Sequence, residues 1–369
     1  MLRHLASNIT RTRTLIIQGS HGVRAASDFF CNPAPSLQHL EVLSRGTFLY
    51  LPENFLGQHA PSLRSVSFSG IFPTFESPFV LPNLTEFSLY TLESAGPFHL
   101  SGLFRFFSDS PRLQKVHIDI SSEALQDIPP DQTISLELLE ELDYVCHSVS
   151  QALSFLRLPC LKRLRVSSSL GSGRMPKLAD ILPYGGHALL AGATKMWYHS
   201  DRRALKVDLS GNEVDVSFSM FHTTADPTTV DWLFDPIWIP FGQIEDLKVE
   251  VYPAAAGFPI SVLGLENLRI LRVTQHDTRF TEGFLRMFHP DSGAGVPCRS
   301  LREIEYTSWG SPESRIRPLI TLVMERKRVG YQLRLVHLVS FGQISDQDSV
   351  EEMRGHVGEV RVRAWEEGM

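Results

Sequence analysis

The stretch Pro111-Arg-Leu-Gln-Lys-Val-His-Ile118 carries the pattern that decides the fold. Its apolar residues Leu113, Val116 and Ile118 stand at the first, fourth and sixth positions of a six-residue unit. Residues two apart in a strand point to the same side, so Val116 and Ile118 share one face, while Leu113 lies where the chain enters the strand. We name this unit the apolar triplet. It recurs with starts at Leu37, Leu63, Leu84, Leu139, Leu161, Ile244, Leu268 and Leu301.

The spacing of the apolar triplets predicts the fold class. Neighbouring triplets start between 21 residues (Leu63 to Leu84) and 33 residues (Leu268 to Leu301) apart, with one longer interval in the middle of the chain. A period of roughly 20 to 30 residues around such a core is typical of a leucine-rich-repeat solenoid. We therefore expect an α/β solenoid, with a parallel sheet on its concave side and helices and loops on its convex side.

The segments between triplets agree with this expectation. Residues 99–108 place apolar side chains on one face of a helix, and residues 151–156 form a shorter version. Proline or serine often precedes a triplet, and proline ends the preceding element because it fixes φ and restricts the residue before it. Strand, turn, helix and return thus make one turn of the coil.

The interval from Leu161 to Ile244 is about three periods long. Within it, residues 205–209 and 214–218 alternate with period two around a Gly-Asn turn, which predicts a β-hairpin. We expect atypical hairpin-containing repeats over about residues 170–235, in preference to a separate small domain. Helix-like segments at residues 177–182 and 229–234 flank the hairpin.

The C-terminal part of the chain is expected to close the solenoid. Residues 316–328 predict a helix with Ile320, Val323 and Met324 inward and cations in its last turn, where they suit the helix dipole. Residues 333–339 alternate like a strand. Ser349 opens a capping box. We assign residues 1–345 to the solenoid and residues 346–369 to a capping helix and strand, because the last repeat needs a cover.

Composition excludes several classes of protein. The 369 residues have a net charge of −6, which argues against a broad nucleic-acid-binding surface. No apolar run reaches the roughly 18 residues of a membrane-spanning helix, so no membrane partner is expected. Arginines without acids before Asp28 leave a mitochondrial presequence as an alternative, but residues 14–17 read better as a first strand. The cysteines form no Cys-x-x-Cys pair, which fits an intracellular, cytoplasmic or nuclear protein: Cys31, Cys146, Cys160 and Cys298.

The sequence contains no strong catalytic motif, so we expect no enzyme, no cofactor and no metal. Hydrolase, zinc-protease and phosphate-loop signatures are absent, and residues 171–177 have the wrong glycine spacing for a phosphate loop. The pairs His276-Asp277 and His289-Pro-Asp291 are weak acid–base or metal candidates in loop-like segments. Residues 226–231 read as a turn and helix cap.

The residues between the apolar strand positions are the candidate binding surface. They should face the concave side, where a broad surface of mixed charge suits a protein partner. Each of these residues taken alone is more simply a solvated surface residue. The candidate partner-binding residues are Glu86, Ser88, Lys115, His117, Glu141, Asp143, Arg163, Arg165, Lys248, Arg272 and Glu305.

The sequence pattern of the repeats resembles that of fungal F-box/leucine-rich-repeat-like proteins. The resemblance covers most of the chain, with moderately specific motifs at residues 34–43, 103–117, 318–328 and 351–360. Members of that family typically dock on a cullin ubiquitin ligase through an N-terminal F-box, while their repeats select the substrate. This chain departs from the pattern, because no F-box-like segment precedes its first repeat and Leu51-Pro-Glu53 lies within the repeats.

The resemblance therefore implies the substrate-recognition part of an F-box-type ubiquitin-ligase adaptor. Its expected partner is a protein or substrate, and ligase components are expected only if an F-box lies upstream. The alternative is a stand-alone leucine-rich-repeat scaffold unrelated to ubiquitination.

Overall fold

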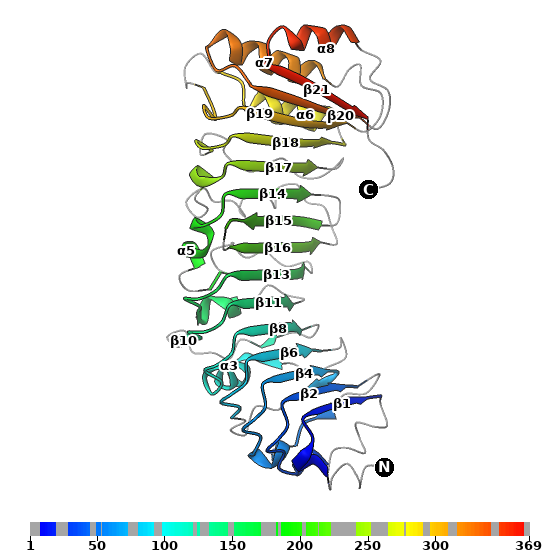
Figure 1. Ribbon diagram of the computed structural model, residues 1–369, viewed down its shortest axis with the longest axis vertical. Coiled ribbons are helices and arrows are strands. Elements are labelled where there is room, and N and C mark those ends of the chain that lie inside the picture. The colour runs from blue at the N-terminus through cyan, green and yellow to red at the C-terminus, as the bar shows by residue number, and fades with distance from the viewer. Residues whose placement is uncertain are drawn as a thin grey trace. The chain divides into compact units, whose positions relative to one another are not determined.

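The chain divides into two compact units, which are residues 1–186 (unit 1) and 187–369 (unit 2). Figure 1 shows their elements. The computed structural model describes residues 8–19, 29–44, 49–52, 54–72, 80–91, 98–120, 124–125, 133–146, 151–170, 182–183, 186–200, 204–212, 214–222, 241–251, 265–276, 278–290, 296–308, 316–340 and 347–364.

Unit 1 is built on a parallel sheet whose strands follow one another in chain order. Each strand pairs with the next along the sheet without reversal. The strands are β1 (Thr14–Gln18), β2 (His39–Leu43), β4 (Ser65–Ser69), β6 (Glu86–Tyr90), β8 (Lys115–Ile120), β11 (Glu141–Cys146) and β13 (Arg163–Leu170).

The apolar triplets of unit 1 align across this sheet. The middle apolar residue of each triplet is register-paired with the middle residue of the triplet on the next strand, from Leu40 through Val66, Phe87 and Val116 to Leu142 and Leu164. The residues of the triplet that begins at Leu113 are buried: Leu113, Val116 and Ile118 are 1%, 3% and 2% exposed. The inward positions read from the sequence are therefore confirmed.

The same turn introduces each of these triplets. The backbone N–H of its first leucine donates to the carbonyl three residues earlier, as from Leu63 to Ala60 and from Leu113 to Ser110. Pro61 and Pro111 occupy the second position of these turns. Proline is favoured there because its fixed φ matches the turn. We call this feature the lead-in turn. It sets where each strand begins.

Aromatic rings fill part of the unit 1 core. Phe55 and Phe68 lie 5.8 Å apart between ring centroids, Phe68 and Phe87 lie 6.4 Å apart, and Phe87 and Phe106 lie 4.9 Å apart. Phe106 and Phe107 come from helix α3 (Leu100–Ser108), as the sequence predicted for residues 99–108. Phe106, which the sequence reading did not place inward, is also buried. Such rings bury large apolar areas and add edge-to-face attraction.

Short elements connect the main strands of unit 1. Within the described part, three two-stranded parallel pairs lie outside the main sheet. They are β3 (Leu49–Tyr50) with β5 (Ile71–Phe72), β7 (Phe98–His99) with β9 (Ala124–Leu125), and β10 (Ile134–Ser135) with β12 (Leu156–Arg157). The 3₁₀ helices are η1 (Ile9–Arg11), η2 (Phe29–Cys31), η3 (Phe55–Gln58) and η4 (Gln151–Phe155).

Unit 2 contains a mixed sheet in which most strands are parallel. Its order is β16-β15-β14-β17-β18-β19-β20-β21, and β15 runs antiparallel to both of its neighbours. The pair β15–β16 is the hairpin expected from the period-two alternation. The strands are β14 (Lys195–Ser200), β15 (Ala204–Ser210), β16 (Asp215–His222), β17 (Asp246–Val251), β18 (Ile270–Gln275), β19 (Glu303–Ser308), β20 (Leu335–Ser340) and β21 (Glu359–Ala364).

The triplets of unit 2 also share one register. Leu247, Leu271 and Ile304 are paired on β17, β18 and β19 and are 0–1% exposed. The helical segments around these strands are α5 (Gly186–Ala191, whose first residue ends unit 1), η6 (Phe241–Gln243), α6 (Thr278–Arg286), α7 (Arg317–Arg328) and α8 (Gln347–Arg354). The sequence reading did not foresee α6.

Two details of the C-terminal part correct the sequence reading. In α7, Met324 is 40% exposed, whereas Arg326 is fully buried. The Arg326 guanidinium donates to the carbonyl oxygens of Pro297 and Cys298, both at 2.9 Å, so it caps a neighbouring backbone segment and does not face water. In β20, Val336 and Leu338 are buried and Leu335 and His337 are not, which is the opposite of the alternation predicted over residues 333–339; Val339 and Ser340 at the end of the strand are also buried.

Each unit is therefore a mixed α/β structure dominated by a mostly parallel sheet with few helices and not closed into a barrel. Among the described residues, no helix combines the length and hydrophobicity needed to cross a membrane. The predicted helices at 177–182 and 229–234 fall almost entirely outside the described residues, as do residues 171–177 and 226–231.

Candidate functional site

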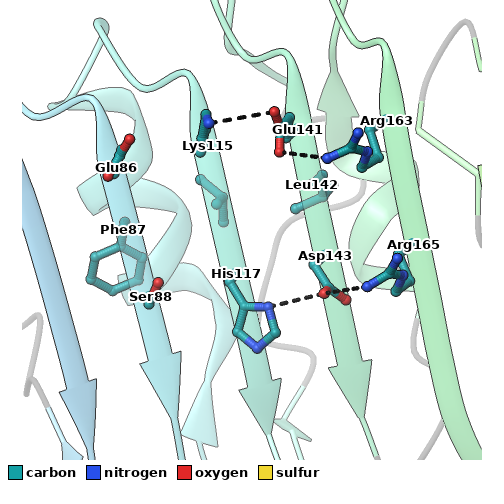
Figure 2. Close-up of a pocket in the computed structure, with 11 residues that line it drawn as sticks. Glu86, Phe87, Ser88, Lys115, His117, Glu141, Leu142, Asp143, Arg163 and Arg165 are labelled. Carbon is teal, nitrogen blue, oxygen red and sulfur yellow. Dashed lines mark hydrogen bonds and ion pairs between the residues drawn. The ribbon is translucent and has the colours of Figure 1, made fainter. Parts of the chain in front are cut away.

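The strands of unit 1 present two rows of polar side chains on the face opposite the buried triplets. We call this surface the polar face of unit 1. Neighbours within each row are register-paired from strand to strand. On β6, β8, β11 and β13 the first row is Glu86, Lys115, Glu141 and Arg163, and the second row is Ser88, His117, Asp143 and Arg165. Figure 2 shows these eight side chains together.

A groove of about 340 Å³ lies on this polar face. Its lining combines the two rows with strand residues Phe87, Val116 and Leu142. These three apolar residues are 1–3% exposed because their side chains pack on the core side of the sheet. The accessible surface of the groove is therefore polar and charged.

Ion pairs link the first row. Lys115 Nζ lies 3.5 Å from Glu141 Oε1, and Arg163 donates to Glu141 Oε2 at 3.2 Å. Glu141 thus lies between two cations from the strands on either side (Figure 2). Opposite charges at adjacent cross-strand positions stabilise a sheet modestly.

The second row repeats the arrangement with a histidine. His117 Nδ1 lies 3.0 Å from Asp143 Oδ2, and the Arg165 guanidinium lies 3.7 Å from the same oxygen. The His117 ring also packs on Tyr90, with 4.6 Å between the centroids. Burial and the nearby Asp143 carboxylate raise the pKa of the Tyr90 phenol above its usual value, so that phenol remains a neutral hydrogen-bonding group.

Within the ion pairs of the groove, the cationic side chains are more exposed than the carboxylates they contact. The cationic side chains of Lys115, Arg163 and Arg165 are 52–56% exposed, whereas the Glu141 and Asp143 side chains are 35% and 25% exposed. The carboxylates therefore lie deeper and hold the cations in position. An approaching partner meets these cations and the exposed carboxylate of Glu86.

The remaining three candidate residues lie on the corresponding face of unit 2. Lys248, Arg272 and Glu305 are register-paired across β17, β18 and β19. Arg272 lies 2.9 Å from Asp246 Oδ2 and Lys248 lies 3.9 Å from Glu250 Oε2. The sequence-predicted site therefore falls into two groups, eight residues in the unit 1 groove and three in unit 2.

Glu250 is the centre of a charged cluster that sequence reasoning did not find. Its carboxylate lies 3.6 Å from His199 Nδ1 and 3.5 Å from His276 Nε2. The close polar contact with His199, supported by Lys248, lowers the pKa of Glu250 to about 2, although burial opposes the shift. Burial lowers the pKa of His276, while Glu250 opposes that shift. A signal was available, because Ala193, Met196 and Tyr198 repeat the triplet pattern with a small first residue and place His199 on a strand.

The two histidines of the weak acid–base candidates each contact a glutamate from another element. His276 pairs with Glu250, and His289 Nδ1 lies 2.7 Å from Glu325 Oε2. Asp277 and Asp291 are outside the described residues. Burial raises the pKa of the Cys298 thiol to about 12, which keeps it protonated and unreactive at neutral pH. No group of three or more metal-ligating side chains is found in the described part of the chain.

Comparison with known proteins gives no family assignment. No protein-family model matches the chain, and no curated protein matches it significantly. The function has to be inferred from the groove and from the pattern of charge on the sheets.

Proposed function

We propose that this chain is a non-enzymatic protein-interaction module, built as an irregular leucine-rich-repeat solenoid with a C-terminal cap. The lead-in turns and the common register of the triplets within each unit support the repeat assignment. In such repeats each unit packs on its neighbours, and the strands together provide an extended binding surface. Helix α8 and strand β21 correspond to the proposed cap over residues 346–369.

The observation that carries the proposal is the groove of unit 1. Its surface comes from side chains on four strands, and its cations are about half exposed above partly buried carboxylates. Pockets for small molecules are mostly apolar, whereas alternating charge of this kind provides orientation and specificity towards another protein. The partly buried carboxylates of Glu141 and Asp143 hold the cations in place before a partner arrives.

A more specific form of the proposal is substrate recognition for a cullin-type ubiquitin ligase. It is supported by the resemblance of the repeats and not by the groove itself. The alternative is a stand-alone scaffold with the same surface and no link to ubiquitin. Affinity capture of the protein expressed from its full genomic locus separates the two, since ligase components co-purify with that product, and not with this chain, only in the first case and only if an F-box is encoded upstream.

The test of the groove is affinity capture with mass spectrometry from cells that express the full chain. The variant is Arg163→Glu with Arg165→Glu, which reverses two groove cations. The matched control is Arg157→Glu with Lys162→Glu, which makes the same change in net charge at exposed positions that do not line the groove. We expect partners to be lost from the groove variant and kept by the control. Identical partner sets for all three proteins contradict the proposal.

A further inference from the structure

Trp197 lies on the polar side of the unit 2 sheet, between β15 and β17. It is register-paired with Asp208 on one side and with Lys248 on the other. The ammonium groups of Lys206 and Lys248 each lie 4.7 Å from the centroid of its indole ring. Cations at this distance are attracted to the ring. One aromatic side chain therefore gathers two positive charges from the two neighbouring strands.

The exposed layer around this ring is cationic. Side chains of Lys206, Lys248 and Arg272 are 37%, 43% and 39% exposed. Their carboxylate partners lie deeper, because Asp208, Glu250 and Asp246 are 23%, 17% and 16% exposed. The two ammonium groups lie within twice 4.7 Å of each other, so they repel, and a bound anion relieves that repulsion.

The N–H group of the Trp197 indole makes no hydrogen bond within the described residues. Trp197 Nε1 is buried and has no hydrogen-bond acceptor in the part of the chain that the structure describes. Tryptophan and arginine are enriched among the residues that dominate the energy of protein–protein interfaces. The ring is held on both sides by strands, so it offers a rigid anchor with little entropy to lose.

We propose that Trp197, Lys206, Lys248 and Arg272 form a second docking site, which binds an acidic segment of a protein partner. The cations bind the carboxylates of that segment, and the indole ring provides apolar contact. A nucleic acid would use the same cations, and the comparison with an oligothymidylate below decides between the two ligands. The inference rests on the proposed function for the partner being a protein, but it concerns a different surface and a defined chemistry.

The test is fluorescence anisotropy of a dye-labelled hexaglutamate peptide titrated with the full chain at low salt. The first variant is Lys206→Glu with Lys248→Glu. A second variant, Lys206→Gln with Lys248→Gln, removes the charge and keeps a flexible polar side chain, so it remains informative if charge reversal impairs folding. The control is Arg269→Glu with Arg286→Glu, at exposed positions that pair with Glu245 and Glu282.

We expect saturable binding by wild type, a loss of affinity of about tenfold or more in both lysine variants, and less than about twofold in the control. Binding should weaken as salt is added. The inference is overturned if wild type does not bind hexaglutamate, if the control loses as much affinity, or if the Arg163→Glu, Arg165→Glu variant loses as much affinity as the lysine variants. It is also overturned if an oligothymidylate of the same charge binds more tightly than the peptide.

This peptide assay and the capture experiment fail independently. Loss of hexaglutamate binding in the lysine variants, with cellular partners unaffected by the groove variant, supports the unit 2 site and contradicts the groove. The reverse result supports the groove and contradicts the acidic docking site.

Discussion

Replacement of Leu113 by alanine tests the assignment of inward and outward residues in unit 1. Leu113 is 1% exposed, and the equivalent residues on the flanking strands, Leu84 and Leu139, are 0% exposed. The site is enclosed by residues of the same kind, so it has little freedom to collapse into the space that the mutation creates. We therefore expect a loss of about 3–5 kcal/mol in the free energy of unfolding, the upper part of the range for such changes.

The comparison is with Lys115→Ala, two residues further along the chain at the start of β8. Lys115 is half exposed and its ion pair with Glu141 spans 3.5 Å. A pair of this kind contributes about 0–1 kcal/mol. Lys115→Asp should cost only slightly more because of its new acidic neighbours, whereas Leu113→Asp adds an unpaired buried carboxylate and should prevent unit 1 from folding.

Two measurements check this prediction. Urea denaturation followed by circular dichroism gives the change in unfolding free energy, and hydrogen exchange with mass spectrometry follows the peptide that contains β8. Loss of protection in β8 is expected for Leu113→Ala and not for Lys115→Ala. Similar losses in the two alanine variants would refute the assignment of opposite faces.

Three further predictions concern unit 2. Arg326→Met should lower the free energy of unfolding by about 3 kcal/mol, measured by urea denaturation, because it leaves buried carbonyl groups without a donor; a loss below about 1 kcal/mol means that the carbonyls find other partners. Wild type should lose stability as pH falls from about 4.5 to about 2, because unfolded Glu250 takes up a proton in this range while the folded carboxylate stays ionised. In acid titrations of unfolding, Glu250→Gln should flatten this part of the profile of stability against pH. An unchanged profile contradicts the lowered pKa. Gly211→Ala should destabilise the unit, because the new Cβ would overlap the carbonyl oxygen of Gly192. Gly283→Ala lies in a helix with open space around it and should raise the melting temperature through a gain of about 0.5–1 kcal/mol. Thermal denaturation measures the direction of each change in melting temperature, and equal shifts contradict the packing at Gly211.

The sheet of unit 1 could be predicted from the sequence because its rule is local. Each triplet fixes which side chains of its own strand point inward, and parallel strands then align triplet with triplet. Lys115 and Glu141 were placed in one row on this basis, and the register confirms it. Chain order and spatial order coincide in this unit, so no long-range information was needed.

Unit 2 could be predicted less well because its strand order is not the chain order. The hairpin of β15 and β16 is visible as alternation, but nothing local states that β14 pairs with β17 on its other side. The sequence analysis therefore gives Trp197 no role, since its two lysines come from β15, which follows β14 in the chain, and from β17, which does not. The triplet at Leu333, Val336 and Leu338 was present in the sequence and was overlooked in favour of simple alternation.

Arg326 shows a second limit of sequence reading. An arginine in the last turn of a helix is normally assigned to the surface, where it suits the helix dipole. Its burial depends on carbonyl groups of residues 28 and 29 positions earlier in the chain, Cys298 and Pro297. Periodicity within α7 contains no information about those groups.

The lead-in turn has a consequence for how such a chain can change. Each turn is closed by a backbone hydrogen bond between residues three apart in the chain, so the start of a strand does not depend on how many residues came before the turn. The intervals of 21 and 29 residues that precede Leu84 and Leu113 lead to strands in unbroken register. Insertions and deletions in the connecting segments should therefore leave the surface chemistry intact, so that residue identity on the sheet and connector length are free to diversify separately, in evolution or by design.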